Sequence, residues 1–266
     1  MVDYSSICVE VCQVAREAGE FIGRERRNFS ADKVEEKGDQ SLVSYVDRGA
    51  EELIVKRLKE IVPEAQFITE EHTVAECGEL YDGLCWIIDP LDGTTNFVHN
   101  IPPYCVSIAL MNRQKIVVGV IYEIVSGEMF YAWEGSAAYL DGKEIRVSKV
   151  DSLKNSLIAH GFAYNMHDYI DTFLRQMKYL QLNSNGVRRM GSAAANLAYV
   201  ACGRFDAFSQ RNLASWDVAA GTLIVERAGG VVTDMSGGTN FVFGHQIVAT
   251  NKKIAAEFRK AIADLE

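Results

Sequence analysis

The chain has 266 residues, of which 48% are apolar and 24% are charged, a balance typical of a globular protein with room for a buried polar site. Its formal net charge of −9 argues against a general nucleic-acid-binding protein, because such proteins need clustered Lys and Arg. A phosphorylated substrate stays compatible with this charge, since bound divalent cations reverse the local field.

No apolar run has the length of a membrane span, and the N-terminal residues lack the pattern of a secretory signal. The six cysteines form no Cys-x-x-Cys pair and no zinc-ligand spacing. We therefore expect a cytoplasmic enzyme with reduced thiols and no membrane association.

The first half begins with helices and continues with strands. Apolar residues at three- and four-residue steps predict a helix over residues 7–21. Residues 32–41 are polar and are typical of a loop or a poorly packed hairpin. A second helix should start after Asp47 and stop before Pro63. Short runs rich in β-branched and aromatic residues then predict strands at 66–68, 84–88, 106–111, 116–122, 129–133 and 144–147, with tight turns at 126–128 and 141–142.

The second half alternates between strands and helices. Strands are predicted at 157–160, 205–208, 231–233 and 247–249, and helices at 169–180, 192–201, 217–228 and 254–265. A shift in composition at residues 148–152 is the best candidate for a domain boundary. The pattern predicts an α+β domain over residues 1–148 and an α/β domain over residues 149–266.

The densest chemical signal is the sequence Asp-Pro-Leu-Asp-Gly-Thr-Thr-Asn-Phe at residues 89–97. It follows an apolar strand, so the carboxylate of Asp89 should emerge at the strand's end. Asp92 is three residues later, and across a turn both carboxylates can point into one cavity. Together with the Leu91 carbonyl they form a hard-oxygen site suited to Mg²⁺. The amides of Gly93 and Thr94, at a predicted helix start, are placed to hold a phosphate oxygen.

Each carboxylate also has a simpler explanation. Asp-Pro-Leu-Asp-Gly is a common turn composition, and Glu70 follows a predicted strand where a surface residue is the ordinary case. Asp217 stands at a helix start, where it favours the helix dipole, and Asp47 has the position of an N-cap. The metal-site hypothesis gains weight because these contexts occur together in one chain.

Three segments, residues 86–97, 216–221 and 226–230, resemble the signatures of the inositol monophosphatase family. This resemblance spans nearly the whole chain. It implies a layered α/β/α/β/α sandwich with mixed and antiparallel sheets, a homodimer, and lithium-sensitive, Mg²⁺-dependent hydrolysis of a small phosphate monoester. The first domain would then supply most metal ligands, and Asp217 from the second domain would complete the site.

The resemblance also implies a ligand set for two or three Mg²⁺ ions. Glu70, Asp89 and the Leu91 carbonyl would bind the first ion, Asp89, Asp92 and Asp217 would bind the second, and a weaker third ion would lie near Glu70. One ion would lower the pKa of the attacking water, and another would stabilise the leaving oxygen.

Two proposals for activating the water stay open. Either Glu70 orients or deprotonates it, or Thr94 does so with Asp47 behind it. The substrate itself would contact Asp92, Gly93, Thr94, Ala193, Gln210 and Asp217.

The identity of the substrate depends most on residue 210. In the family an acidic residue seven positions before the helix-start aspartate meets the inositol ring, and here that position is Gln210. Gln keeps an accepting oxygen but loses the charge, and charge-assisted bonds are about twice as strong as neutral ones. Inositol 1-phosphate is our first expectation, and fructose 1,6-bisphosphate or histidinol phosphate is the alternative. A non-enzymatic alternative is a transcription-associated regulatory binding protein, as known among bacterial relatives of the family.

Overall fold

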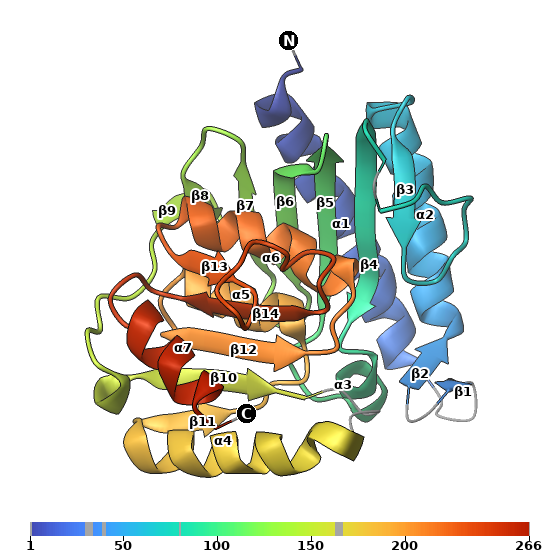
Figure 1. The fold of residues 1–266 in the computed structure, drawn as a ribbon. Coiled ribbons are helices and arrows are strands. Elements are labelled where there is room, and N and C mark those ends of the chain that lie inside the picture. The colour runs from blue at the N-terminus through green and yellow to red at the C-terminus, as the bar shows by residue number, and fades with distance from the viewer. Residues whose placement is uncertain (1, 30–33, 39–40, 80, 163–166, 266) are drawn as a thin grey trace.

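Two β-sheets with helices on their faces form the fold in a computed structural model that describes residues 2–29, 34–38, 41–79, 81–162 and 167–265 (Figure 1). The larger sheet has seven strands in the order β3-β4-β5-β6-β7-β8-β9. Its strands are β3 (Gln66–Thr69), β4 (Leu84–Asp92), β5 (Cys105–Asn112), β6 (Lys115–Glu123), β7 (Glu128–Trp133), β8 (Ala138–Leu140) and β9 (Lys143–Ile145).

The smaller sheet has five strands in the order β11-β10-β12-β14-β13. They are β10 (Leu157–Gly161), β11 (Gly186–Arg188), β12 (Ala207–Arg211), β13 (Val231–Thr233) and β14 (Gln246–Thr250). The helices are α1 (Tyr4–Arg27), α2 (Tyr45–Ile61), α3 (Thr94–His99), α4 (Ile170–Asn183), α5 (Ala193–Ala201), α6 (Ser215–Arg227) and α7 (Ala255–Ala263). A separate hairpin, β1 (Val34–Gly38) with β2 (Ser41–Ser44), precedes α2.

The elements stack in five layers. Helices α1 and α2 cover one face of the seven-stranded sheet, α5 and α6 fill the space between the sheets, and α4 and α7 lie on the outer face of the five-stranded sheet (Figure 1). Both sheets are mixed: β3 runs parallel to β4, and β10 runs parallel to β11 and β12, while the other neighbours are antiparallel. The predicted α/β/α/β/α sandwich is confirmed.

The middle layer is tight because small residues face one another there. A Cβ on Gly119 of β6 would lie 2.6 Å from the Ala220 carbonyl oxygen of α6, and one on Gly221 would lie 2.5 Å from the Leu197 side chain of α5. Helix α6 therefore packs directly on β6 and α5. One hydrophobic cluster contains side chains from both sheets and both helices. The two sheets thus share a core, and the domain boundary at residue 148 stays a prediction.

The structure corrects several predicted boundaries. Helix α2 begins at Tyr45, directly after β2, so Asp47 lies inside its first turn rather than before it. The strand predicted at 205–208 begins at Ala207 and continues to Arg211. The prediction ended too early because the last residues of the strand are polar and do not extend the apolar pattern. The short strands β8 and β11 were not predicted. The predicted polar segment 32–41 includes β1 and the first residue of β2, and residues 32, 33, 39 and 40 lie outside the described part of the chain. Within the described residues, no helix has both the length and the apolar character of a membrane span.

Candidate metal centre

A bulge in strand β4 turns two aspartates toward the same side of the sheet. Asp89 pairs with Ser107 of β5 and Asp92 pairs with Cys105, so three steps along β4 match two along β5. In a regular strand, residues three apart point to opposite faces, and one extra residue restores the same face. The sequence pattern predicted that Asp89 ends the strand. This was wrong, because β4 continues to Asp92. The bulge, rather than a turn after the strand, brings the carboxylates together.

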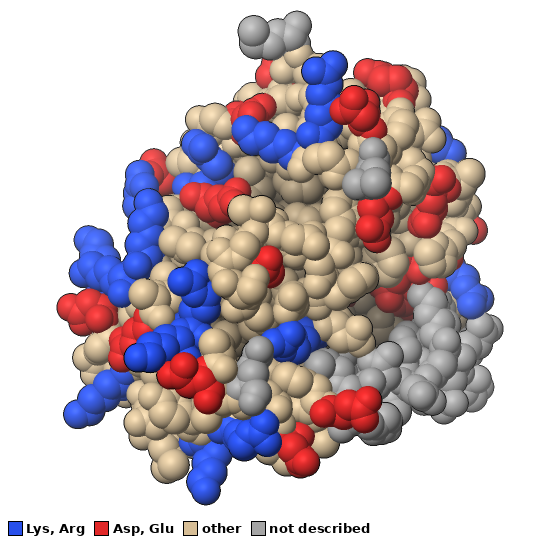
Figure 2. Space-filling view, in the orientation of Figure 1, with Lys and Arg blue, Asp and Glu red and all other residues tan. Residues whose placement is uncertain are grey.

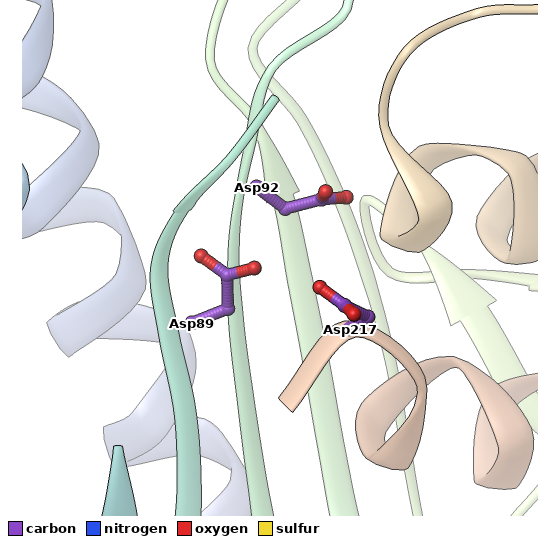
Figure 3. A group of neighbouring side chains, drawn as sticks. All are labelled: Asp89, Asp92 and Asp217. Atoms are coloured by element: carbon purple, nitrogen blue, oxygen red, sulfur yellow. The ribbon is translucent and has the colours of Figure 1, made fainter. Parts of the chain in front are cut away.

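Asp89, Asp92 and Asp217 form one carboxylate cluster (Figure 3). One oxygen from each lies within 4.8 Å of the oxygens chosen from the other two. Asp217 comes from the first turn of α6, where its carboxylate accepts a hydrogen bond of 2.6 Å from the Ala214 backbone N–H. The cluster therefore joins the seven-stranded sheet to the helix layer between the sheets.

Burial and mutual repulsion raise the pKa values of the cluster. Asp89 is 1% exposed, and burial followed by the charges of Glu70, Asp92 and Asp217 raises its pKa well above the usual range. Burial is also the main cause that raises the pKa of Asp217, with the charges of Asp92 and Glu70 adding to it. Burial raises the pKa of Asp92 to about 6, although hydrogen bonds from Ser192 and the amides of α5 act in the opposite direction.

This donor set fits a divalent cation. Within the described part of the chain, no Lys or Arg forms an ion pair with the three aspartates. Buried carboxylates are normally paired with a cation or coordinate a metal, because the unpaired charges are costly to desolvate. All the donors are hard oxygens, which Mg²⁺, Mn²⁺ and Ca²⁺ prefer. The cluster can thus hold a hard divalent ion.

Glu70 lies beside the cluster, on the loop that follows β3. Its backbone N–H donates to the Ile88 carbonyl at 3.2 Å, which places it next to the strand that carries Asp89. The buried carboxylate of Glu51 holds the same loop: it accepts from the backbone N–H groups of Glu71 and Thr73, both at 2.8 Å, and from the Thr73 hydroxyl at 2.7 Å. Helix α2 thereby fixes the loop on which Glu70 stands.

Thr94 connects Asp47 to the metal motif. Its hydroxyl lies 3.1 Å from an Asp47 carboxylate oxygen and 3.2 Å from the Leu91 carbonyl oxygen. The Asp47 side chain is buried, and the Leu91 backbone N–H donates to the Asp89 carboxylate at 2.9 Å. The backbone of the motif is therefore folded around its own aspartate, with the threonine between the motif and α2.

A cavity of about 250 Å³ opens next to these residues. Its lining includes the side chains or backbone of Glu70, Asp92, Gly93, Thr94, Arg189, Ala193, Gln210 and Asp217. Asp89, Leu91 and Asp47 are not part of this lining: Asp89 is buried behind it, and Asp47 accepts a hydrogen bond from the lining residue Thr94. Gly93 adopts a φ of +96°, and a Cβ there would lie 3.2 Å from the Pro103 carbonyl oxygen and 3.3 Å from that of Gly191, so a side chain would be crowded.

Gln210 reaches the cavity because its strand neighbour is a glycine. Gly161 of β10 pairs with Gln210 of β12, and a Cβ on Gly161 would lie 1.9 Å from the Gln210 side-chain oxygen. The amide thus lies across the glycine and into the cavity. Gly161 had no place in the sequence-based site, because the sequence does not show which residue faces it across the sheet.

Ser192 and Asn96 also support the site, and neither was predicted as a functional side chain. The Ser192 hydroxyl donates to Asp92, and its oxygen accepts from the Ala195 backbone N–H at 3.1 Å as the N-cap of α5. The Asn96 amide donates to the Pro103 and Met190 carbonyls at 2.8 and 2.7 Å. A Ser before an Ala-rich run is a recognisable N-cap signal, but its bond to Asp92 depends on the tertiary fold.

Comparison with known proteins places this chain in a large group of relatives. The profile of the inositol monophosphatase family matches residues 3–265. Inositol monophosphatase 2 of Solanum lycopersicum is 41% identical over 271 residues, covering 100% of both chains. The Nus factor SuhB of Pseudomonas aeruginosa is 41% identical over 244 residues, covering 91% of this chain and 90% of that protein. The crystal structure of the extragenic suppressor protein suhB from Bartonella henselae superposes with a TM-score of 0.90 at 38% identity, covering 97% of this chain and 98% of that one.

Proposed function

The chain belongs to the inositol monophosphatase family, and on that basis we propose that it hydrolyses a small phosphate monoester, first of all inositol 1-phosphate, with the help of two or three Mg²⁺ ions. The observation that supports the proposal most directly is the buried carboxylate cluster beside a cavity large enough for a sugar phosphate. Family membership makes the chain a phosphatase; the ion, the substrate and the residue roles belong to the proposal.

We assign the ligands as the family resemblance implies. Glu70, Asp89 and the Leu91 carbonyl would hold one ion, and Asp89, Asp92 and Asp217 would hold another. When bound, the ions supply a water of lowered pKa and a positive field for the leaving oxygen. Two helix-layer contacts, from Ser192 and from the Ala214 amide, hold Asp92 and Asp217 in place for this task.

Thr94 is our candidate for positioning the attacking water. Its hydroxyl lies between Asp47 and the Leu91 carbonyl, so the buried Asp47 carboxylate can accept the hydroxyl proton, and Thr94 also lines the cavity. Glu70 is the other candidate, because it lines the same cavity. The Gly93 and Thr94 amides, at the left-handed turn before α3, would hold the phosphate oxygens.

The substrate's hydroxyl groups would meet another part of the cavity lining. This lining includes Gln210 and Ala193, together with Asp217. Gln210 can both donate to and accept from a hydroxyl, which suits a polyol. It carries no charge, so selectivity for inositol over other polyol phosphates should be modest, and fructose 1,6-bisphosphate and histidinol phosphate stay on the list of candidates.

The direct test is phosphate release from a panel of cyclitol, sugar and histidinol phosphates, with and without Mg²⁺ and with added Li⁺. We expect Mg²⁺-dependent release that falls to background in Asp89→Asn and is unchanged in Asp151→Asn, which alters an exposed aspartate. If the wild-type protein released no phosphate from any member, the proposal would be wrong. The specificity constants within the panel decide between inositol 1-phosphate and the alternatives.

A second role is suggested by the name of one close relative, the Nus factor SuhB. On the face shown in Figure 2, Lys and Arg side chains alternate with Asp and Glu rather than forming one basic stripe. Together with the formal net charge of −9, this face favours a protein partner over direct RNA binding. Recovery of RNA polymerase with tagged Asp89→Asn protein would support the role independently of catalysis. Light scattering would test the homodimer that the family resemblance predicts.

A further inference from the structure

Two thiols outside the metal centre lie unusually close together. The Sγ atoms of Cys77 and Cys85 are 2.9 Å apart, inside the ordinary contact distance of two sulfur atoms. Cys85 belongs to β4 and is fully buried, whereas Cys77 is partly exposed on the segment between β3 and β4. Both are free thiols in the structure.

We propose that Cys77 and Cys85 are a reversible oxidation site that forms an intramolecular disulfide. A disulfide has an S–S bond of about 2.05 Å, so the sulfur atoms need to approach by less than about 1 Å. Small side-chain rotations supply such a movement.

Backbone contacts already hold the two cysteines beside neighbouring residues of β3. Cys85 pairs with Gln66 of β3, and the Cys77 backbone N–H donates to the carbonyl of the next residue, Phe67, at 3.0 Å. Both sulfur atoms are therefore placed by the native fold rather than by chance encounters of a loop. The loss of chain entropy that normally opposes disulfide formation has therefore already occurred on folding, before oxidation begins.

The two thiols differ in how they would react. Burial raises the pKa of Cys85, so it is a poor first target for an oxidant, and it carries no exposed surface. Cys77 is partly exposed and would be attacked first. With hydrogen peroxide as oxidant, the Cys77 sulfur takes one oxygen to give a sulfenic acid, and one water leaves. The Cys85 sulfur then displaces the hydroxyl, its proton leaves with that hydroxyl as a second water, and the S–S bond forms.

The disulfide would link the segment between β3 and β4 covalently to β4 without moving the aspartates. Cys85 lies four residues before Asp89 on a strand that is paired on both sides, with β3 and with β5. Glu51 holds the first part of the loop from another direction. We expect the oxidised protein to keep its hydrolytic activity within about twofold and to melt at a higher temperature, by about 3–8 °C for a loop of this length.

The test is thiol counting and peptide mapping after treatment of the native protein with hydrogen peroxide. The six free thiols should fall to four and return to six with dithiothreitol. Trypsin leaves both cysteines in one peptide that also contains Cys105, whereas cleavage after glutamate and aspartate separates all three. A disulfide between 77 and 85 then links residues 77–79 to residues 83–92 in a peptide pair with a diagnostic mass. Alkylation before digestion prevents exchange.

Three variants make the result decisive. Cys77→Ser, which alters the partly exposed partner, should abolish the loss of two thiols and the rise in melting temperature. Cys202→Ser, which alters a partly buried cysteine elsewhere, should retain both. Cys85→Ala should behave as Cys77→Ser does if it folds. The proposal is overturned if Cys77→Ser still loses two thiols, if the linked peptides contain other cysteines, or if Cys77 gains two oxygens while Cys85 stays alkylatable.

Discussion

The Ser192 hydroxyl donates a hydrogen bond to the Asp92 carboxylate and so links the helix layer between the sheets to the bulged strand β4, across 100 residues of the chain. The Ala194 backbone N–H donates to the same carboxylate oxygen at 2.7 Å. Asp92 thus stands at the N-terminus of α5, where the helix dipole favours a negative charge. One serine both caps the helix and orients a predicted metal ligand.

Replacing Ser192 by Ala should weaken metal binding more than it weakens folding. Loss of an orienting partner of a ligand typically costs about 10–100-fold in metal affinity or activity. Loss of the N-cap costs about 1 kcal/mol of stability. We expect a higher Mg²⁺ concentration for half-maximal phosphate release, measured by titration, with a small drop in melting temperature. Ser192→Thr keeps both hydrogen bonds and should stay close to wild type; equal losses in the two variants would contradict the orienting role.

Without metal, the carboxylate cluster should make the protein less stable as the pH rises. The folded pKa of Asp92 is about 6 against an ordinary value of 3.8, and those of Asp89 and Asp217 are also raised. A carboxyl group whose pKa is raised in the folded state contributes to the free energy of unfolding. This contribution is complete below about pH 4 and is lost as the pH rises through about 6. In chelator, the melting temperature should therefore fall from pH 5 to pH 7.5 by several degrees, and Mg²⁺ should restore it at pH 7.5.

His160 requires a control in that experiment. Burial lowers its pKa to about 4, so acidification below pH 6.5 destabilises the fold through this residue, in the opposite direction. Asp89→Asn keeps His160 and removes one charge from the cluster. The drop between pH 5 and pH 7.5 in chelator should be smaller in Asp89→Asn than in wild type, and the variant should be the more stable of the two at pH 7.5. A steeper drop in the variant would argue against charge repulsion.

Glu51→Gln should loosen the loop that carries Glu70. The two Glu51 oxygens accept three hydrogen bonds from Glu71 and Thr73, and a Gln amide nitrogen cannot accept them. A buried N–H left without its partner costs about 1–3 kcal/mol. We expect a lower denaturant midpoint and a lower kcat, measured together. Glu52→Gln, on the exposed side of the same helix, should change neither quantity.

Residue 210 should control the choice of polyol. Gln210→Glu would place a charge where hydroxyl groups are expected, and charged hydrogen bonds exceed neutral ones by about 1 kcal/mol, or about fivefold in affinity. The specificity constant for inositol 1-phosphate, divided by that for the other panel members, should rise by about this factor. Gly161→Ala should raise KM instead, because its Cβ would displace the Gln210 side chain. An unchanged substrate ranking in both variants would remove Gln210 from the substrate site.

Local patterns predicted the parts of this fold that local physics decides. The apolar periodicity of α1 appears in the sequence because one face of the helix is buried, and the continuous apolar runs of β5 and β6 appear because both faces of these strands are buried. The layered architecture required the family resemblance. Three features could not be predicted, because each depends on the register or packing of residues far away in the chain. They are the bulge between Asp89 and Asp92, the hydrogen bond from Ser192, and the hydrogen bonds that Glu51 accepts from the Glu70 loop. Gly161 was missed for the same reason: its partner Gln210 is a cross-strand neighbour.

The extra residue in β4 makes the length of this segment as important as its composition. Adding one residue between Asp89 and Asp92 while the bulge persists would reverse the parity of the strand and send one carboxylate to the opposite face, towards α1 and α2. Removing one would abolish the bulge and shift the Leu91 carbonyl that lies within it. A change of residue type at Pro90 would leave that parity intact. During divergence, this stretch should therefore accept substitutions far more readily than insertions or deletions.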